Sequence, residues 1–176
     1  MCAVASTARD RRQARGLFLV GTVAGRIKAM DARDLEIRNA TYGMFVNLGR
    51  APTADEVSTA AGVTDTEVQE SWRRLHQAHA LVLDPATSEI RMANPFSAVP
   101  TAYHVQAAGR WWYANCAWDA LGVCAALHVD GQIETSCPDC GEPIAVEVHA
   151  QRPDHPRLLF HCLVPAAHWW DDIIFT

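Results

Sequence analysis

The stretch NCAWDALGVCAAL, residues 115–127, places a thiol, Cys116, three residues before a carboxylic acid, Asp119. In a helix, residues three apart lie on the same face, so these two side chains would be neighbours. A thiolate is a nucleophile and a ligand for soft metal ions. A carboxylic acid in apolar surroundings has a raised pKa and is able to donate its proton as a general acid near neutral pH. This pair is therefore the first candidate reactive centre.

Aromatic side chains flank this pair: Trp111, Trp112 and Trp118. Aromatic shielding would exclude water and favour the protonated form of the acid. A simpler interpretation treats Cys116 and Cys124 as ordinary core thiols and lets Asp119 face solvent. Helical periodicity alone does not separate the two interpretations, so both stay open at this point.

The second candidate is the motif Cys137-Pro-Asp-Cys140, which is followed by glycine. Many zinc sites begin in this way, because the turn directs two thiolates at one ion. A closed tetrahedral site needs two more ligands; Cys162, His161 and His168 are available, but a second C-x-x-C is absent. A redox function is less favoured, since no βαβ unit precedes the motif. The pair is a candidate zinc site, and a plain surface turn is the simpler interpretation.

The C-terminal segment 161–172 gathers two tryptophans, histidine and two carboxylates. A helix start with Asp171 and Asp172 near the positive end of its dipole accounts for these residues without catalysis. The sequence contains no G-x-x-x-x-G-K-[ST], G-x-G-x-x-G, G-x-S-x-G or H-E-x-x-H motif. Nucleotide, dinucleotide and common hydrolase functions therefore have no support.

The elements that position these candidate residues follow two different sequence patterns. The pattern of the N-terminal half is helical. Apolar periodicity predicts a helix within residues 35–49 that ends at Gly49. Thr53 and Glu56 form a capping box for a second helix, and a third begins at Thr64 or Asp65. Residues 81–95 then fit two short strands around a turn at 84–87. Three helices followed by a β-hairpin are typical of a winged helix-turn-helix.

The charge of this N-terminal module disfavours DNA as a partner. Its third helix offers Arg73 and Arg74, but these lie among Asp65, Glu67 and Glu70. The net charge of the whole chain is -5, whereas a DNA-binding surface is usually basic. The alternative is that the module packs on its neighbour.

Beyond residues 94–105 the pattern changes. Residues 111–129 fit a second long helix, residues 135–150 fit a strand, the C-x-x-C knuckle and a second strand, and residues 157–165 fit a further strand. We therefore expect an α+β fold. The expected domains are an N-terminal extension over residues 1–29, a winged-helix domain over 30–98 that opens at Met30, and a small mixed α/β domain over 99–176.

Composition and cysteine placement favour a protein of the cytoplasm. Hydrophobic residues make up 49% of the chain and charged residues 20%, which fits a packed globular core. No apolar stretch approaches the roughly 18 residues that a membrane span needs. The six cysteines include a tight C-x-x-C and two in one apolar run, a distribution more typical of reduced thiols than of disulfides.

Taken together, the segments WWYANCAWDAL, SCPDCGEPIAVEV and LLFHCLVPAAHWWDDIIFT resemble the organomercurial (alkylmercury) lyase family over residues 34–176. The resemblance implies that one thiolate binds the mercury of an organomercury substrate, a second thiolate adds, and a carboxylic acid protonates the carbon. Cys116 would be the first thiolate, with mercury held transiently beside it and Asp119, and Asp119 would be the proton donor. No cofactor is implied; Hg(II) would stay on sulfur until small thiols or a mercuric reductase remove it.

The resemblance has one departure. In the family the second catalytic cysteine follows a segment like HWWDDIIFT, and here that segment ends at Thr176. Cys124 is about 12 Å along a helix from Cys116, too far to act as the second catalytic thiol. Cys162, or one of the thiols of the C-x-x-C, would have to take that role. The expected enzyme is thus one whose second thiol is missing or substituted. The alternatives are a non-catalytic, thiol-rich protein that binds mercury and, less favoured, a metal-responsive winged-helix regulator.

Overall fold

The computed structural model describes residues 30–154, 158–159 and 162–175, so the expected extension over residues 1–29 lies outside the described part. Residues 31–176 belong to one unit by their contacts. The domain boundary expected between residues 98 and 99 stays a prediction. Within the described residues, no helix is long and apolar enough to cross a membrane.

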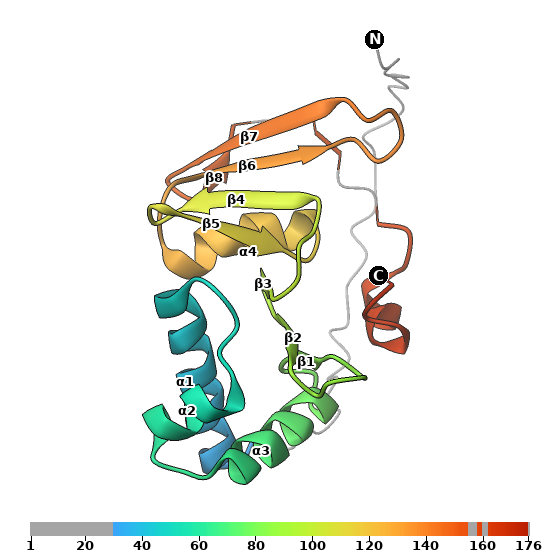
Figure 1. Cartoon of the computed structure of the whole chain (residues 1–176). Coiled ribbons are helices and arrows are strands. Elements are labelled where there is room, and N and C mark those ends of the chain that lie inside the picture. Colours follow the sequence, from blue (N-terminus) through green and yellow to red (C-terminus); the bar gives the residue numbers. More distant parts are fainter. Residues whose placement is uncertain (1–29, 155–157, 160–161, 176) are drawn as a thin grey trace, which may run out of the picture. The chain divides into compact units, whose positions relative to one another are not determined.

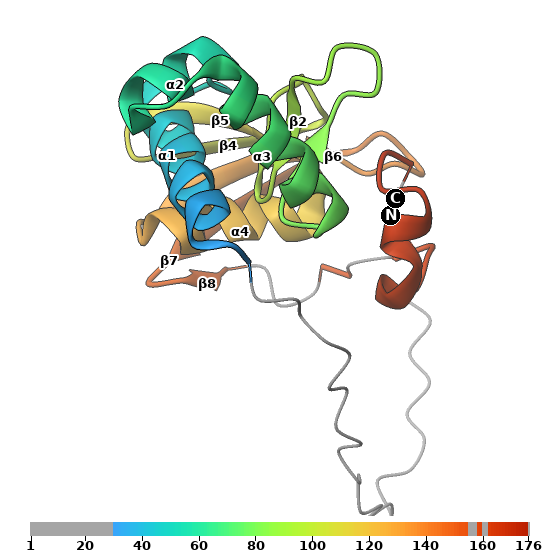
Figure 2. The ribbon, with the colours of Figure 1, turned by 90° about the horizontal axis from the view of Figure 1, so that it is seen from below.

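Three helices form the N-terminal part: α1 (Ala32–Leu48), α2 (Ala54–Ala61) and α3 (Asp65–Gln77). Local sequence signals explain their ends. Gly49 terminates α1 with φ 72°, in the left-handed region. The predicted capping box of Thr53 and Glu56 starts α2, and a second one, formed by Thr64 and Glu67, starts α3. The helices pack against one another as one group, which Figure 2 shows from below.

Polar contacts fix α1 against α3. The indole Nε1 of Trp72, a fully buried side chain, donates to Thr41 Oγ1 at 2.9 Å. Asp34 is buried and accepts from Ser71 Oγ at 2.7 Å and from Arg74 Nη2 at 2.7 Å. A buried carboxylate needs such partners. Hydrogen bonding from Arg74 accordingly lowers the pKa of Asp34, against the opposing effect of burial.

Among the residues that the structure describes, an eight-stranded antiparallel sheet follows, in the order β1-β2-β3-β5-β4-β6-β7-β8 (Figure 1). Its register pairs Phe96 with Ala114, Val105 with Trp112 and with Ile133, and Ile133 with Val146. The predicted hairpin over residues 81–95 is its first pair of strands. The strands are β1 (Val82–Leu83), β2 (Ile90–Ala93), β3 (Phe96–Ser97), β4 (Tyr103–Ala107), β5 (Arg110–Ala114), β6 (Gly131–Ser136), β7 (Pro143–His149) and β8 (Arg152–Pro153).

The expected helix over residues 111–129 is wrong in its first part. Residues 110–114 form strand β5, and helix α4 (Ala117–Leu127) begins only after Cys116. Along β5, Trp112 and Ala114 are buried whereas Trp111 and Tyr113 are exposed. This alternation has the period of a strand, and aromatic side chains favour strands. Pairing with β4 on one side and β3 on the other therefore decides the conformation.

Helix α4 packs on β4, β5 and β6. Gly131, at the start of β6, allows this approach: a Cβ there would lie 2.7 Å from the Cys124 sulfur and 2.7 Å from the Gln106 carbonyl oxygen. Cys124 is fully buried in the core cluster that joins the helices to the sheet. It is therefore an ordinary core thiol, as the simpler interpretation predicts for it.

The C-terminal segment differs from its expected strand over residues 157–165. Residues 158–159 and 162–165 are not in a strand, and His161 lies outside the described residues. A short 3-10 helix, η1 (Ala166–Asp171), follows. The Trp170 ring stacks on the His79 ring just after α3, with centroids 4.0 Å apart and planes at 3°. This contact ties the segment to the N-terminal helices.

Candidate active site

One cavity of about 210 Å³ contains the predicted reactive pair. It lies beyond the end of β5 and at the start of α4, and residues of the C-terminal segment close its other wall. The lining is mostly apolar, with one carboxylic acid, two thiols and two amide side chains. The lining residues are Met92, Asn94, Tyr103, Asn115, Cys116, Trp118, Asp119, Cys162, Leu163, Val164, Trp169, Ile173, Ile174 and Phe175.

Cys116 is the N-cap residue of α4 and is half-buried. The first backbone amides of a helix have no hydrogen-bond partner within the helix, so the amides of Trp118 and Asp119 are available to the Cys116 sulfur. Burial raises the pKa of the Cys116 thiol; the amides of Asp119 and Trp118 oppose this effect, and the charge of the Asp119 carboxylate adds to it. The surroundings of Cys116 therefore favour the protonated thiol.

Asp119 is the third residue of α4 and is half-buried beside Cys116. Burial raises the pKa of its carboxyl group, and a hydrogen bond from Asn115 works against this shift. Asn115 Nδ2 donates to Asp119 Oδ2 at 3.0 Å. The carboxyl group thus has the shielded environment that a proton donor requires.

The source of that shielding differs in part from the prediction. Trp112 is 4% exposed and points into the core, where its Nε1 donates to the Ala107 carbonyl oxygen. Trp111 is 50% exposed on the surface of β5. Of the three flanking tryptophans, only Trp118 lines the cavity, and Trp169 of η1 lines it as well. The C-terminal segment therefore supplies much of the apolar wall.

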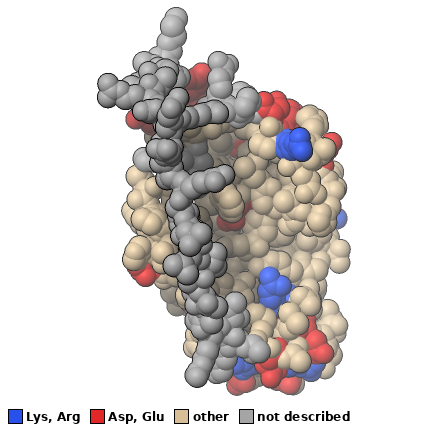
Figure 3. Space-filling view, turned by 180° about the vertical axis from the view of Figure 1, so that it is seen from behind, with Lys and Arg blue, Asp and Glu red and all other residues tan. Residues whose placement is uncertain are grey.

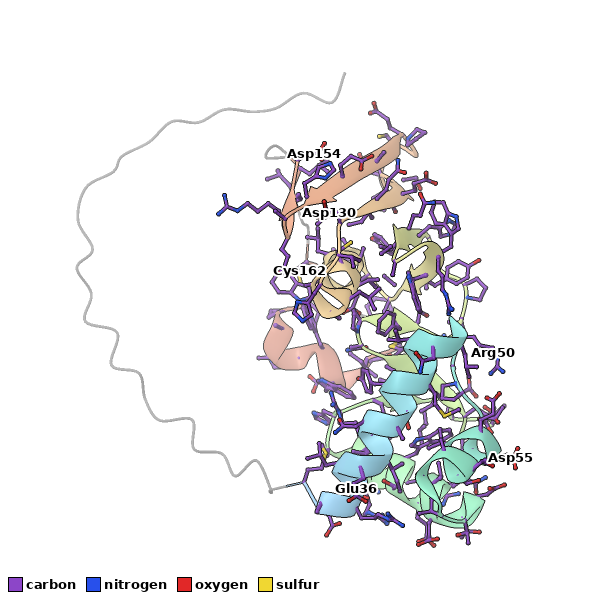
Figure 4. The ribbon with its side chains drawn as sticks, turned by 90° about the vertical axis from the view of Figure 1, so that its left-hand side faces the viewer. Glu36, Arg50, Asp55, Asp130, Asp154 and Cys162 are labelled. Atoms are coloured by element: carbon purple, nitrogen blue, oxygen red, sulfur yellow. The ribbon has the colours of Figure 1, made fainter. Side chains whose placement is uncertain are left out.

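Cys162 lines the same cavity as Cys116 and is labelled in Figure 4. It is exposed, and its thiol donates to the Val164 carbonyl oxygen at 2.8 Å. Its charge is also among the smaller influences that raise the pKa of Cys116, behind burial. The structure therefore brings Cys162, the candidate substitute thiol, together with Cys116 and Asp119.

The remaining candidates lie elsewhere. Cys137 and Cys140 sit in the loop between β6 and β7 and do not line the cavity. His168 lies 3.0 Å from Asp171 through its Nδ1 atom. Among the residues that the structure describes, no three or more His, Cys, Asp or Glu side chains gather into a metal site. A four-ligand zinc site at the C-x-x-C gains no support from these residues.

Sequence reasoning missed Asn115 and Tyr103. Asn115 lies four residues before Asp119, and a helical or near-helical spacing of four is a signal that could have revealed this contact. Tyr103 reaches the cavity because β4 pairs with β5. Nothing in the sequence shows this pairing without the fold.

An α+β fold that holds two thiols and a shielded acid in one apolar cavity defines a protein suited to soft-metal chemistry. Residues 96–176 match the alkylmercury lyase (MerB) family. Ten chains of solved structures match as well. One, the mercury-bound form of MerB2, is 26% identical with a TM-score of 0.56, over 70% of this chain and 58% of that one. No curated protein matches.

Residues 96–176, which carry most of the cavity lining, are therefore similar to the alkylmercury lyase family. The chain matches less than two thirds of the length of the MerB2 structure. The predicted α+β fold and the predicted family are confirmed. The assignment of the three helices and hairpin to a winged helix-turn-helix stays a prediction.

Proposed function

We propose that this chain is an organomercurial lyase, which cleaves the carbon–mercury bond by protonolysis and yields a hydrocarbon and thiol-bound Hg(II). The observation that carries the proposal is the cavity shared by Cys116, Asp119 and Cys162. The match of residues 96–176 to the alkylmercury lyase family supports it, as does the likeness to a MerB2 structure described as mercury-bound.

The reaction begins when the mercury of R–Hg–X binds the Cys116 sulfur and X leaves. Metal binding deprotonates a thiol, and the raised pKa of Asp119 lets its carboxylate accept that proton. The Cys162 sulfur adds as a second ligand and gives its proton to water. Asp119 then protonates the carbon, and the electron pair of the C–Hg bond forms the new C–H bond. R–H leaves, and mercury stays in oxidation state two on both sulfurs.

The walls of the cavity suit the organic group. A cavity of about 150 Å³ lined by apolar side chains is enough to hold benzene, so about 210 Å³ has room for a phenyl group with its metal. Leu163 and Ile174 are among the apolar side chains that line it.

The alternative function, storage of soft metal ions without catalysis, needs sulfur ligands only. A shielded carboxyl group is costly and has no use in such a site. Asp119 therefore favours catalysis. For both functions the thiols must stay reduced, as they do in the cytoplasm; the two cavity thiols, Cys116 and Cys162, are free.

DNA binding has little support in the charge distribution. Arg74 of α3 is paired with Asp34. Glu36 and Asp55 are among the side chains labelled on the helical part in Figure 4. On the face seen in Figure 3, Lys and Arg are scattered and do not form a patch. A phosphate-binding surface needs several neighbouring cations.

Turnover of phenylmercury with excess small thiol tests the proposal, with benzene measured in the headspace. We expect benzene from the wild type and none above background from Cys116→Ala or Asp119→Ala. Tight retention of Hg(II) without benzene would instead support the storage function. Release of Hg(II) to small thiols or to a mercuric reductase would complete the cycle.

A further inference from the structure

A second pair of thiols lies at the tip of the hairpin between β6 and β7. Cys137 is half-buried and Cys140 is exposed. Main-chain bonds close the turn: Cys137 N–H donates to the Glu142 carbonyl oxygen at 2.9 Å, and Gly141 N–H donates to the Cys137 carbonyl oxygen at 2.8 Å. Gly141 has φ 74°, which glycine adopts without strain. Main-chain hydrogen bonds therefore hold this turn closed.

The turn also directs donors at one sulfur. Hydrogen bonding from the Cys140 amide first, then from the Asp139 amide and the Cys140 side chain, lowers the pKa of the Cys137 thiol. The contact between the two side chains places the thiols next to each other. The thiolate is the form that binds metal ions, and metal binding itself deprotonates a thiol. The hairpin is thus a preformed pair of sulfur ligands.

The number of ligands selects the kind of ion. Structural zinc takes four ligands, and in the described ranges no third Cys, His, Asp or Glu side chain joins the pair. Hg(II) is soft and forms stable complexes with two thiolates. A pair of adjacent thiolates without further ligands therefore suits Hg(II) better than zinc.

The hairpin and the cavity lie at the same end of the sheet. The pairs Tyr103–Ala114 and His104–Glu134 show that β5 and β6 both run toward the end of the sheet at which β4 begins. Figure 1 shows the arrowhead of β5 and the turn between β6 and β7 at this end. Only β4 separates the two strands, so β5 and β6 are about 10 Å apart. Tyr103 of β4 lines the cavity itself.

We propose that Cys137 and Cys140 form a two-thiolate acceptor site for Hg(II), which receives the ion from the cavity. The source of the ion rests on the proposed lyase function, whereas binding of Hg(II) at the hairpin does not. The transfer is a ligand exchange without redox change. Two S–Hg bonds form at the hairpin, two break at Cys116 and Cys162, and the two protons released by the hairpin thiols restore the cavity thiols.

Retention of inorganic Hg(II) tests the site independently of turnover. The full chain is reduced, desalted without oxygen, loaded with two equivalents of Hg(II) and challenged with a small monothiol before the bound metal is measured. The cavity variant Cys116→Ala/Cys162→Ala is expected to keep one equivalent. Adding Cys137→Ser/Cys140→Ser is expected to reduce this to near zero. An unchanged equivalent in the four-fold variant, or none in the cavity variant, would overturn the proposal.

Two further measurements sharpen the test. The cavity variant is loaded with Zn(II) in parallel; tight retention of zinc at the hairpin would contradict the assignment to a two-ligand soft ion. Phenylmercury is then given to the wild type without added thiol. Transfer to the hairpin predicts two equivalents of benzene per chain, and one in Cys137→Ser/Cys140→Ser. Equal yields from both would refute transfer, and no benzene from either would refute the lyase function alone.

Discussion

Two thiols of this chain, Cys116 and Cys137, lie just after the ends of strands β5 and β6 of the same sheet. Their surroundings shift the thiol pKa in opposite directions. Both are half-buried. At Cys116 burial dominates and raises the thiol pKa, whereas at Cys137 amide donors dominate and lower it. The difference shows that the residue type alone does not set reactivity: the balance of burial and amide donors does.

The opposite pKa shifts of Cys116 and Cys137 arise from the residues that cover the ends of β5 and β6. Beyond β5 the C-terminal segment forms an apolar wall over Cys116, and Asp119 lies beside it. Beyond β6 the loop stays open to solvent, and Cys140 is exposed. The first environment suits proton transfer to carbon beside an apolar wall, and the second suits capture of a released ion. Removing the wall or the acid should therefore affect one region and leave the other unchanged.

Replacing the acid has the largest expected effect. General acid catalysis contributes about 10²- to 10⁴-fold, so Asp119→Asn should lower kcat with phenylmercury by that amount. Glu134→Gln, an exposed acid on β6, is the matched control and should keep wild-type kcat. A kcat for Asp119→Asn within about twofold of the control would exclude Asp119 as the proton donor.

Alkylation kinetics compare the two thiols directly. Because the thiolate is the nucleophile, iodoacetamide at pH 7 should modify Cys137 at least about tenfold faster than Cys116. Mass spectrometry of peptides that separate the two cysteines gives both rates. Cys124, which is fully buried, should react more slowly than either. Equal rates for Cys116 and Cys137 would contradict the comparison.

Loosening the C-terminal segment that covers Cys116 should bring the alkylation rates of Cys116 and Cys137 closer together. Trp170→Ala removes the ring that stacks on His79 at 4.0 Å. Such a pair is worth about 0.5–1.5 kcal/mol, so alkylation of Cys116 should become about two- to twelvefold faster while that of Cys137 stays the same. Trp111→Ala, which removes an exposed tryptophan outside the cavity, serves as control. A rate for Cys116 unchanged from this control would mean that η1 does not shield it.

The smallest effect concerns the pH dependence. The hydrogen bond from Asn115 stabilises ionised Asp119, so Asn115→Ala should raise the pKa of Asp119 further. The proton is lost as pH rises through this pKa, so the alkaline fall of kcat should move to higher pH, with less than about a threefold change at neutral pH. Asn47→Ala, an exposed residue, should leave the profile unchanged. A shift to lower pH would contradict the assigned role.

Local signals made part of this account predictable. The capping box of Thr53 and Glu56 is contained within four residues and was found from the sequence. The spacing of three residues also predicts that Cys116 and Asp119 are neighbours, and both line one cavity. The strand over residues 110–114 was missed, because its aromatic residues fit either period until β3 and β4 pair with it.

Long-range placement was the part that the sequence did not provide. Cys162 lies 46 positions after Cys116, and only the path of the C-terminal segment brings both to one cavity. The same holds for the shielding: Trp112 is close to the pair in sequence but packs in the core, whereas distant Trp169 lines the cavity. The position of the β6–β7 hairpin at the same end of the sheet as the cavity depends in turn on the strand order.

Protonolysis of the carbon–mercury bond is tested most directly by isotope labelling of the hydrocarbon. The reduced chain reacts with phenylmercury in D₂O, and headspace mass spectrometry determines the amount and the mass of the benzene. The account predicts benzene that carries one deuterium from the wild type, and none above background from Cys116→Ala. Phenylmercury that remains intact on the wild-type protein, with no deuterated benzene released, would contradict it.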